Sequence, residues 1–146
     1  MTVLIRSARP EDAPDIVRLI TELAGSIGEH SPISENYVNV YMSHLDDSIL
    51  LAEENRHVVG LISFSARPNL YHAASSCLIE ELILTTTARS RGVGSALIDE
   101  VIRRAAALDC AEIGVSTLED NEEAIAFYNK HGFVDEAVLL EMHLEE

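Results

Sequence analysis

The chain has 146 residues, of which 47% are hydrophobic and 24% are charged, and its formal net charge is -15. This length suits a single domain over residues 1–146 with a core of its own, and the composition excludes a disordered chain. The excess of acidic residues opposes binding to nucleic acid and to anionic membranes, and it favours cationic small molecules or basic protein segments as partners.

Neither a membrane anchor nor a metal site is expected. No apolar run approaches the roughly 18 residues that cross a bilayer. Charges and a proline interrupt the N-terminal stretch that would otherwise form a signal peptide, so we expect a cytoplasmic protein. The six histidines show no HxxxH or HExxH spacing, and we therefore expect no bound metal.

The first half of the chain is predicted to contain a strand, two helices and two further strands. Asp12 can cap the first helix, and Pro14 lies early in it, ahead of an apolar stripe at helical spacing. The pattern then changes to that of strands joined by a turn at Asn55. The predicted segments are 3–8 (strand), 9–27 and 35–45 (helices), and 48–54 and 57–66 (strands).

The second half begins with a predicted polar loop at 67–76 and then alternates strands with helices. Such strand–helix–strand units imply a parallel pair of strands in the sheet. The predicted segments are strands at 77–87, 112–118 and 133–144, and helices at 92–109 and 119–132.

A glycine-rich turn joins the strand that ends near Leu84 to the helix that begins near Gly92. Glycine there weakens the helix by roughly 1 kcal/mol relative to alanine, so the turn needs a bare backbone. Unpaired N–H groups and a partial positive charge at a helix start suit an anion, most naturally a pyrophosphate. The residues expected to bind it are Arg89, Ser90, Arg91, Gly92, Val93, Gly94 and Ser95.

Two other glycine-rich motifs do not fit this turn. A Walker A loop needs a lysine after its last glycine, and none follows Gly94. A dinucleotide fingerprint needs a third glycine where Leu97 stands. Taken alone, the RxxGxG pattern also fits an ordinary flexible start of a helix.

Two motifs together resemble the GNAT acetyltransferase superfamily. The stretch ILTTTARSRGVGSALI resembles the family's acyl-CoA-binding motif, [QR]xxGx[GA], with Arg89, Gly92 and Gly94 in the signature positions. The stretch DNEEAIAFYNKHGFV resembles the second signature of the family. The residues that fill it are Asn121, Ala124, Tyr128, Gly132 and Phe133.

This resemblance implies an α/β fold and a cosubstrate. The sheet would be a central mixed twisted sheet of six to seven strands, flanked by about four helices, with two splayed parallel strands. Acetyl-CoA would lie in the gap between these strands as the acyl donor. Backbone groups of Leu82, Ile83 and Leu84 would pair with its pantetheine arm, and Asn121 would hydrogen-bond to it.

Acetyl transfer to an amine needs removal of a proton from the amine, a donor to the developing oxyanion and a proton for the leaving thiolate. Tyr128 is the candidate acid, which the resemblance places beside the sulfur, because a phenol with a pKa near 10 is protonated at neutral pH. The alternative is an aromatic residue of the core. We expect the oxyanion donor to be a backbone N–H, such as that of Leu82.

Glu80 and Glu81 are the candidate ammonium anchor and base. In a regular strand they would point to opposite faces, and burial of one unpaired carboxylate would be costly. A β-bulge or a cleft would resolve the conflict, and the family commonly has a bulge in this strand. The alternative is one solvated glutamate and one paired with an arginine.

The expected function is transfer of an acetyl group to a primary amine of a small cationic molecule, by direct attack in a ternary complex. The acidic pair resembles those of polyamine and some aminoglycoside acetyltransferases. Two alternatives stay open: a protein lysine or N-terminal acetyltransferase, and a non-catalytic acyl-CoA-binding module. Family members are often dimers, and the last predicted strand could pair with a second copy.

Overall fold

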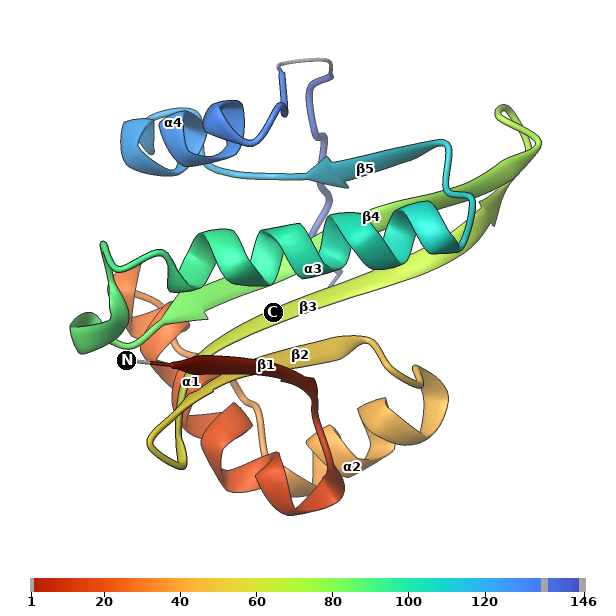
Figure 1. Ribbon diagram of the computed structural model, residues 1–146. Helices are drawn as coiled ribbons and strands as arrows, with labels where there is room; N and C mark the ends of the chain where they lie inside the picture. Colours follow the sequence, from red (N-terminus) through yellow and green to blue (C-terminus); the bar gives the residue numbers. More distant parts are fainter. Residues whose placement is uncertain (1, 135–136, 145–146) are drawn as a thin grey trace.

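The computed structural model describes residues 2–134 and 137–144, and its centre is one five-stranded sheet in the order β1-β2-β3-β4-β5 (Figure 1). The strands are β1 (Val3–Ser7), β2 (Ile49–Glu54), β3 (His57–Asn69), β4 (Ala74–Leu84) and β5 (Glu112–Val115). The described helices are α1 (Ala13–Ser26), α2 (Glu35–His44), α3 (Val93–Ala107) and α4 (Glu122–Lys130), with short 3-10 helices η1 (Pro10–Asp12) and η2 (Thr86–Ala88).

The sheet is mixed, because β1 to β4 pair antiparallel and β4 pairs parallel with β5. The connection between the two parallel strands passes through α3. The parallel pair that the strand–helix–strand order predicts is therefore confirmed, as is the expectation of about four flanking helices.

Helices cover both faces of the sheet, and the alternation of each strand divides its side chains between two cores. Leu50 and Ala52 of β2 lie in the core under α3, together with Leu97 and Val101. The neighbouring residues Ile49 and Leu51 lie in the second core with side chains of α1 and α2.

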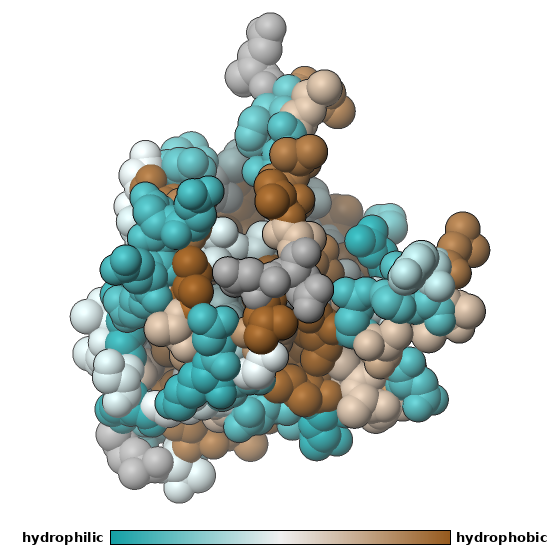
Figure 2. All heavy atoms as spheres, turned by 90° about the horizontal axis from the view of Figure 1, so that it is seen from above, coloured by the Kyte–Doolittle hydropathy of each residue, from teal (hydrophilic) through white to brown (hydrophobic). Residues whose placement is uncertain are grey.

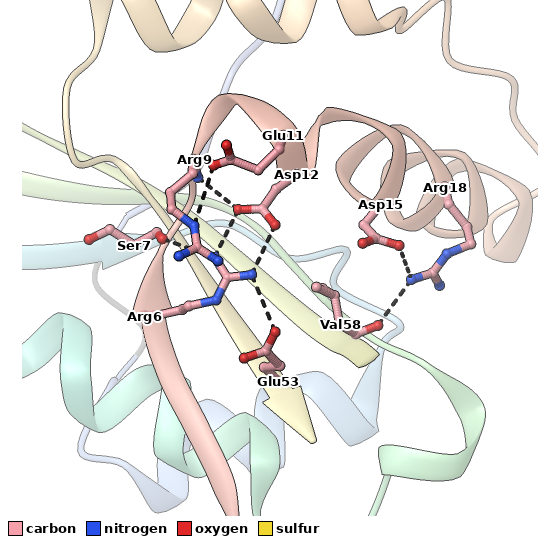
Figure 3. Close-up of polar contacts among 9 residues, drawn as sticks. All are labelled: Arg6, Ser7, Arg9, Glu11, Asp12, Asp15, Arg18, Glu53 and Val58. Atoms are coloured by element: carbon pink, nitrogen blue, oxygen red, sulfur yellow. Dashed lines mark hydrogen bonds and ion pairs between the residues drawn. The ribbon is translucent and has the colours of Figure 1, made fainter. Parts of the chain in front are cut away.

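An ion pair fixes the start of α1 against the sheet (Figure 3). Both Arg6 Nη atoms contact the carboxylate of Asp12, at 2.8 and 2.9 Å, and the backbone N–H of Arg9 donates to the same carboxylate at 2.7 Å. The hydrogen bonds from Arg6 hold the pKa of Asp12 below its usual value. Asp12 stands at the N-cap of α1 as predicted, but its carboxylate makes no bond to a helix N–H group.

The predicted polar loop at 67–76 is wrong. Pairing between β3 and β4 continues to Asn69 opposite Ala74, which leaves only residues 70–73 as the turn. The polar side chains of this stretch lie on a hairpin that extends beyond the helices, where they need no burial.

The predicted sheet of six to seven strands is also wrong, since the described chain forms five and neither 133–134 nor 137–144 is a strand. Residues 135–136 of that predicted strand lie outside the described residues. An alternating apolar pattern indicates which face of a segment is buried, but it does not provide a neighbouring strand with which the segment can form backbone hydrogen bonds. Figure 2 shows hydrophobic side chains in a band on the face seen from above, and the C-terminal segment exposes Val138, Leu139, Leu140, Met142 and Leu144.

Candidate active site

The parallel strands β4 and β5 pair over only part of their length. The register runs from Ser76 opposite Glu112 to Ile79 opposite Val115, and then β5 ends while β4 continues to Leu84. Figure 1 shows the strands side by side near the β3–β4 hairpin and separating toward α4. The two parallel strands are therefore splayed at their carboxyl ends, which is where open α/β sheets bind ligands.

Backbone groups of β4 point alternately toward β3 and toward the side on which β5 has ended. Thr85 N–H donates to Val59 at 2.8 Å, and the pairs that precede it in register are Leu84 with Gly60, Ile83 with Leu61 and Leu82 with Ile62. Because hydrogen-bonded and non-bonded pairs alternate in an antiparallel ladder, Ile83 bonds to β3 while Leu82 and Leu84 turn their N–H and C=O groups to the opposite side, where β5 no longer pairs. Of the three predicted cofactor-pairing residues, the register leaves two free for that role.

The turn between β4 and α3 ends in a left-handed backbone. Gly92 has φ 82° and ψ 5° at the N-cap of α3, and Ser90 has φ 63°. A Cβ at Gly92 would meet no atom within 4 Å, so the backbone angle, and not crowding, is what favours glycine there. At Gly94 the reason is different, since a Cβ would lie 3.3 Å from Phe127 Cζ.

This turn presents a row of free amide donors. Within the described chain, the N–H groups of residues 90–95 donate to no protein acceptor, whereas Ala96 N–H closes the first turn of α3 onto Gly92 at 3.0 Å. Consecutive N–H groups at a helix start form a site for an anion such as a diphosphate. The predicted residues from Ser90 to Ser95 are thus brought together in one turn and the start of one helix.

The two predicted arginines of the turn have different surroundings. Arg91 binds Glu54 of β2 with two hydrogen bonds, at 2.8 and 3.0 Å, and donates to the carbonyl of Thr87. The hydrogen bonds from Arg91 lower the pKa of the Glu54 carboxyl. The Arg89 side chain is exposed and makes no ion pair with the described residues. Arg91 therefore anchors the turn, whereas the Arg89 guanidinium has no carboxylate partner among the described residues.

Helix α4 packs on the start of α3 and carries the second signature. The side-chain oxygen of Asn121 caps α4 by accepting from Ala124 N–H at 3.1 Å, and its amide NH₂ group makes no hydrogen bond with a described residue. At the other end of α4, His131 Nε2 lies 2.9 Å from Ser95 Oγ. These contacts couple α4 to the turn that offers the free amides.

Tyr128 is a half-buried residue of α4 within an aromatic cluster. Its ring makes edge contacts with Phe127 and Phe133, at centroid distances of 5.3 and 5.7 Å. Burial raises the pKa of the Tyr128 hydroxyl, so it stays protonated at neutral pH. The described chain offers the hydroxyl no hydrogen-bond partner, so its proton is not committed to another residue. Whether the hydroxyl meets a thioester sulfur stays a prediction.

The expected β-bulge is present at the two candidate glutamates. Glu81 pairs with Ser63 and Ile79 pairs with Phe64, so Glu80 is the extra residue in β4. Glu80 is exposed and Glu81 is half-buried. Neither carboxylate forms an ion pair with a described residue, so the arginine partner of the alternative interpretation is not found.

Sequence reasoning did not assign Tyr41 of α2 to this site. Burial raises the pKa of its hydroxyl, the negative charges of Glu81 and Glu80 add to the rise, and a hydrogen bond with Ser48 opposes it. The register places Glu81 on the same face of the sheet as Ile83, which is the face that α2 covers. The signal in the sequence is a pair of tyrosines, Tyr37 and Tyr41, four residues apart on one helix face.

The described residues show neither a metal cluster nor a membrane-spanning helix. Among residues 2–134 and 137–144, no three His, Cys, Asp or Glu side chains gather closely enough to hold a metal ion. In the same part of the chain, no helix is both long and apolar enough to cross a bilayer.

Comparison with known proteins gives a family and several relatives. The sequence matches the acetyltransferase (GNAT) family over residues 14–133. The uncharacterized protein YdhI of Bacillus subtilis (strain 168) is 29% identical over 92 residues, which span 63% of this chain and 52% of that protein. The chain thus matches about half the length of this curated relative.

Two solved structures share the whole fold. A transcriptional regulator from Bacillus halodurans C-125 superposes with a TM-score of 0.85 at 27% identity, covering 98% of this chain and 100% of that one. An aminoglycoside acetyltransferase from an uncultured soil metagenomic sample, in complex with sisomicin, superposes with a TM-score of 0.82 at 16% identity, covering 98% and 97%. The second likeness is one of fold alone.

Proposed function

Because the chain belongs to the GNAT acetyltransferase family, we propose that it transfers an acetyl group from acetyl-CoA to a primary amine of a small cationic molecule. The observation that carries this proposal is the stretch of β4 that continues beyond the end of β5. Free N–H groups of residues 90–95 stand at one end of it, and the bulge with Glu80 and Glu81 stands at the other.

The residues along this stretch and in the turn after it fit acetyl-CoA. The N–H groups of the turn and the Arg89 guanidinium would hold its diphosphate, while Leu82 and Leu84 offer backbone partners to the pantetheine arm and Asn121 offers its amide NH₂. When bound there, acetyl-CoA supplies a thioester carbonyl as the electrophile.

Each proton of the reaction then has a residue of this chain. Glu81 takes the proton from the ammonium group, so that the neutral amine can attack. The N–H of Leu82, which points away from β3, donates to the oxygen on which charge develops. Tyr128, which burial keeps protonated, gives its proton to the leaving thiolate. The phenolate then regains a proton from the nitrogen of the tetrahedral intermediate, which is positively charged after the attack, and Glu81 releases its proton to solvent.

A cationic acceptor fits the face that α2 covers. Glu80 and Glu81 bring two carboxylates that lack cationic partners in the described chain, and the rings of Tyr37 and Tyr41 stand on the nearby helix. Carboxylates and aromatic faces both attract ammonium groups. The net charge of -15 adds a long-range attraction for such substrates.

A second candidate function is an acyl-CoA-binding regulator without catalysis. It is favoured by one relative, because the B. halodurans protein, which is 27% identical, is described as a transcriptional regulator. Such a module would need the free amides of the turn but would need neither the Tyr128 hydroxyl nor the two carboxylates at the bulge.

Release of free CoA thiol tests the proposal and separates the two candidates. Acetyl-CoA would be mixed with the protein and with matched pairs of amines, each pair comprising a diamine or polyamine and a neutral amide of similar length. We expect thiol release that depends on both the protein and the cationic amine. Tight acetyl-CoA binding without amine-dependent release would favour the regulator, and absence of acetyl-CoA binding would refute both.

A further inference from the structure

Ser63 is a buried polar residue in the middle of the sheet, next to the bulge. It lies on β3, opposite Glu81 of β4, and only 3% of its surface is exposed. A buried hydroxyl is costly unless it is hydrogen-bonded, so its partners indicate why serine stands there.

Both partners of the hydroxyl belong to Glu81. The backbone N–H of Glu81 donates to Ser63 Oγ at 3.0 Å, and Ser63 Oγ donates its own proton to Glu81 Oε1. At the bulge, the Ser63 hydroxyl thus takes the place of a backbone acceptor of β3 for the N–H of Glu81. The same hydroxyl also holds the Glu81 carboxylate.

This pair of bonds restricts the glutamate strongly. With Oε1 bonded to Ser63, the carboxylate has a fixed orientation, and Oε2 makes no hydrogen bond with a described residue. Opposite residues of an antiparallel pair point to the same face. The free oxygen is therefore held on the face of α2, where Tyr41 lies.

We propose that Ser63 is a positioning residue that holds Glu81 with one oxygen directed at the acceptor amine. This inference rests on the proposed function, in which Glu81 accepts the proton of the ammonium group. Ser63 touches neither the amine nor the acyl donor, and it acts only through Glu81. Its removal would leave the carboxylate present but free to rotate, which lowers the rate of proton transfer.

A kinetic double-mutant cycle tests the coupling. The variants are Ser63→Ala, Glu81→Gln and the double variant, with Ser65→Ala as a control on the same strand. We expect Ser63→Ala to lower kcat about ten- to a hundred-fold and Glu81→Gln about a hundred-fold or more, with the KM for acetyl-CoA unchanged within about two-fold. The double variant should be no slower than Glu81→Gln alone. Ser65→Ala should match the wild type.

The outcomes separate this proposal from the proposed function. If Ser63→Ala lowers kcat by the same factor in the Glu81→Gln background as in the wild type, or leaves kcat unchanged in the wild type, Ser63 does not act through Glu81, while the glutamate keeps its role. If Glu81→Gln leaves kcat unchanged, the base assignment itself is wrong. Ser63→Thr keeps a hydroxyl and should recover at least part of the activity lost in Ser63→Ala. Failure of that rescue in a variant with wild-type thermal stability would contradict the proposal.

Discussion

Replacing Gly92 by alanine isolates the backbone angle of the turn from every other contact. The new methyl group would meet no atom within 4 Å, so the cost comes from φ 82° alone. A left-handed L-residue costs roughly 1–2 kcal/mol, and loss of entropy in the unfolded chain returns roughly 0.4–1 kcal/mol. We therefore expect a net loss of about 1 kcal/mol, or a fall in Tm of about 2–4 °C for a domain of this size.

Thermal unfolding of the Gly92→Ala variant, compared with that of a Gly25→Ala variant, tests whether alanine at position 92 lowers the stability. Gly25 lies within α1 without positive φ, and a methyl group there also meets no atom within 4 Å. Alanine at that position should stabilise the helix by about 0.5–1 kcal/mol. The same chemical change is thus expected to lower Tm at one site and raise it at the other, and only Gly92→Ala should weaken acetyl-CoA binding. A Gly92→Ala variant as stable as Gly25→Ala would refute the left-handed turn.

The remaining predictions concern charge and catalysis. Arg89→Ala should weaken acetyl-CoA binding about ten-fold, whereas Arg91→Ala should chiefly lower Tm, because Arg91 is bound to Glu54; equal effects on affinity in a titration would contradict the division of roles. Tyr128→Phe should lower kcat about a hundred-fold and leave acetyl-CoA affinity unchanged, and the reverse pattern in steady-state kinetics would exclude it as the acid. Hydrogen bonds from Arg103 and Arg104 lower the pKa of Glu100 to about 2. The ionised Glu100 carboxylate therefore stabilises the fold fully above about pH 4.5, and this contribution is lost as the pH falls toward 2. In urea unfolding, Glu100→Gln should have a lower free energy of unfolding than the wild type at pH 7 and a similar one near pH 2.

Local patterns predicted the parts of the site that depend on neighbours in sequence. Glycine at position 92 indicated a special backbone, and the structure shows a left-handed N-cap there. In a regular strand, two adjacent glutamates point to opposite faces, so one of them would enter the core. The strand avoids this by a local distortion, which the structure shows as the β-bulge. These inferences needed only strand alternation and the conformational freedom of glycine.

Contacts between distant segments were not predictable in the same way. The bonds of Arg91 to Glu54 and of Ser63 to Glu81 depend on which strands are neighbours and on the exact register. The register also decides that the backbone of Ile83 pairs with β3 while Leu82 and Leu84 turn outward. A strand pattern at 133–144 likewise carries no information about whether a neighbouring edge is available to it.

Amide hydrogen exchange along β4 and the turn, with and without acetyl-CoA, tests the central claim most directly. The account predicts that the N–H groups of Leu82, Leu84 and residues 90–95 exchange rapidly in the free protein and become protected by the ligand, whereas Ile83 is protected throughout. Protection that develops elsewhere, or a free protein in which Leu82 and Leu84 are already as slow as Ile83, would show that this edge of β4 does not hold the acyl donor.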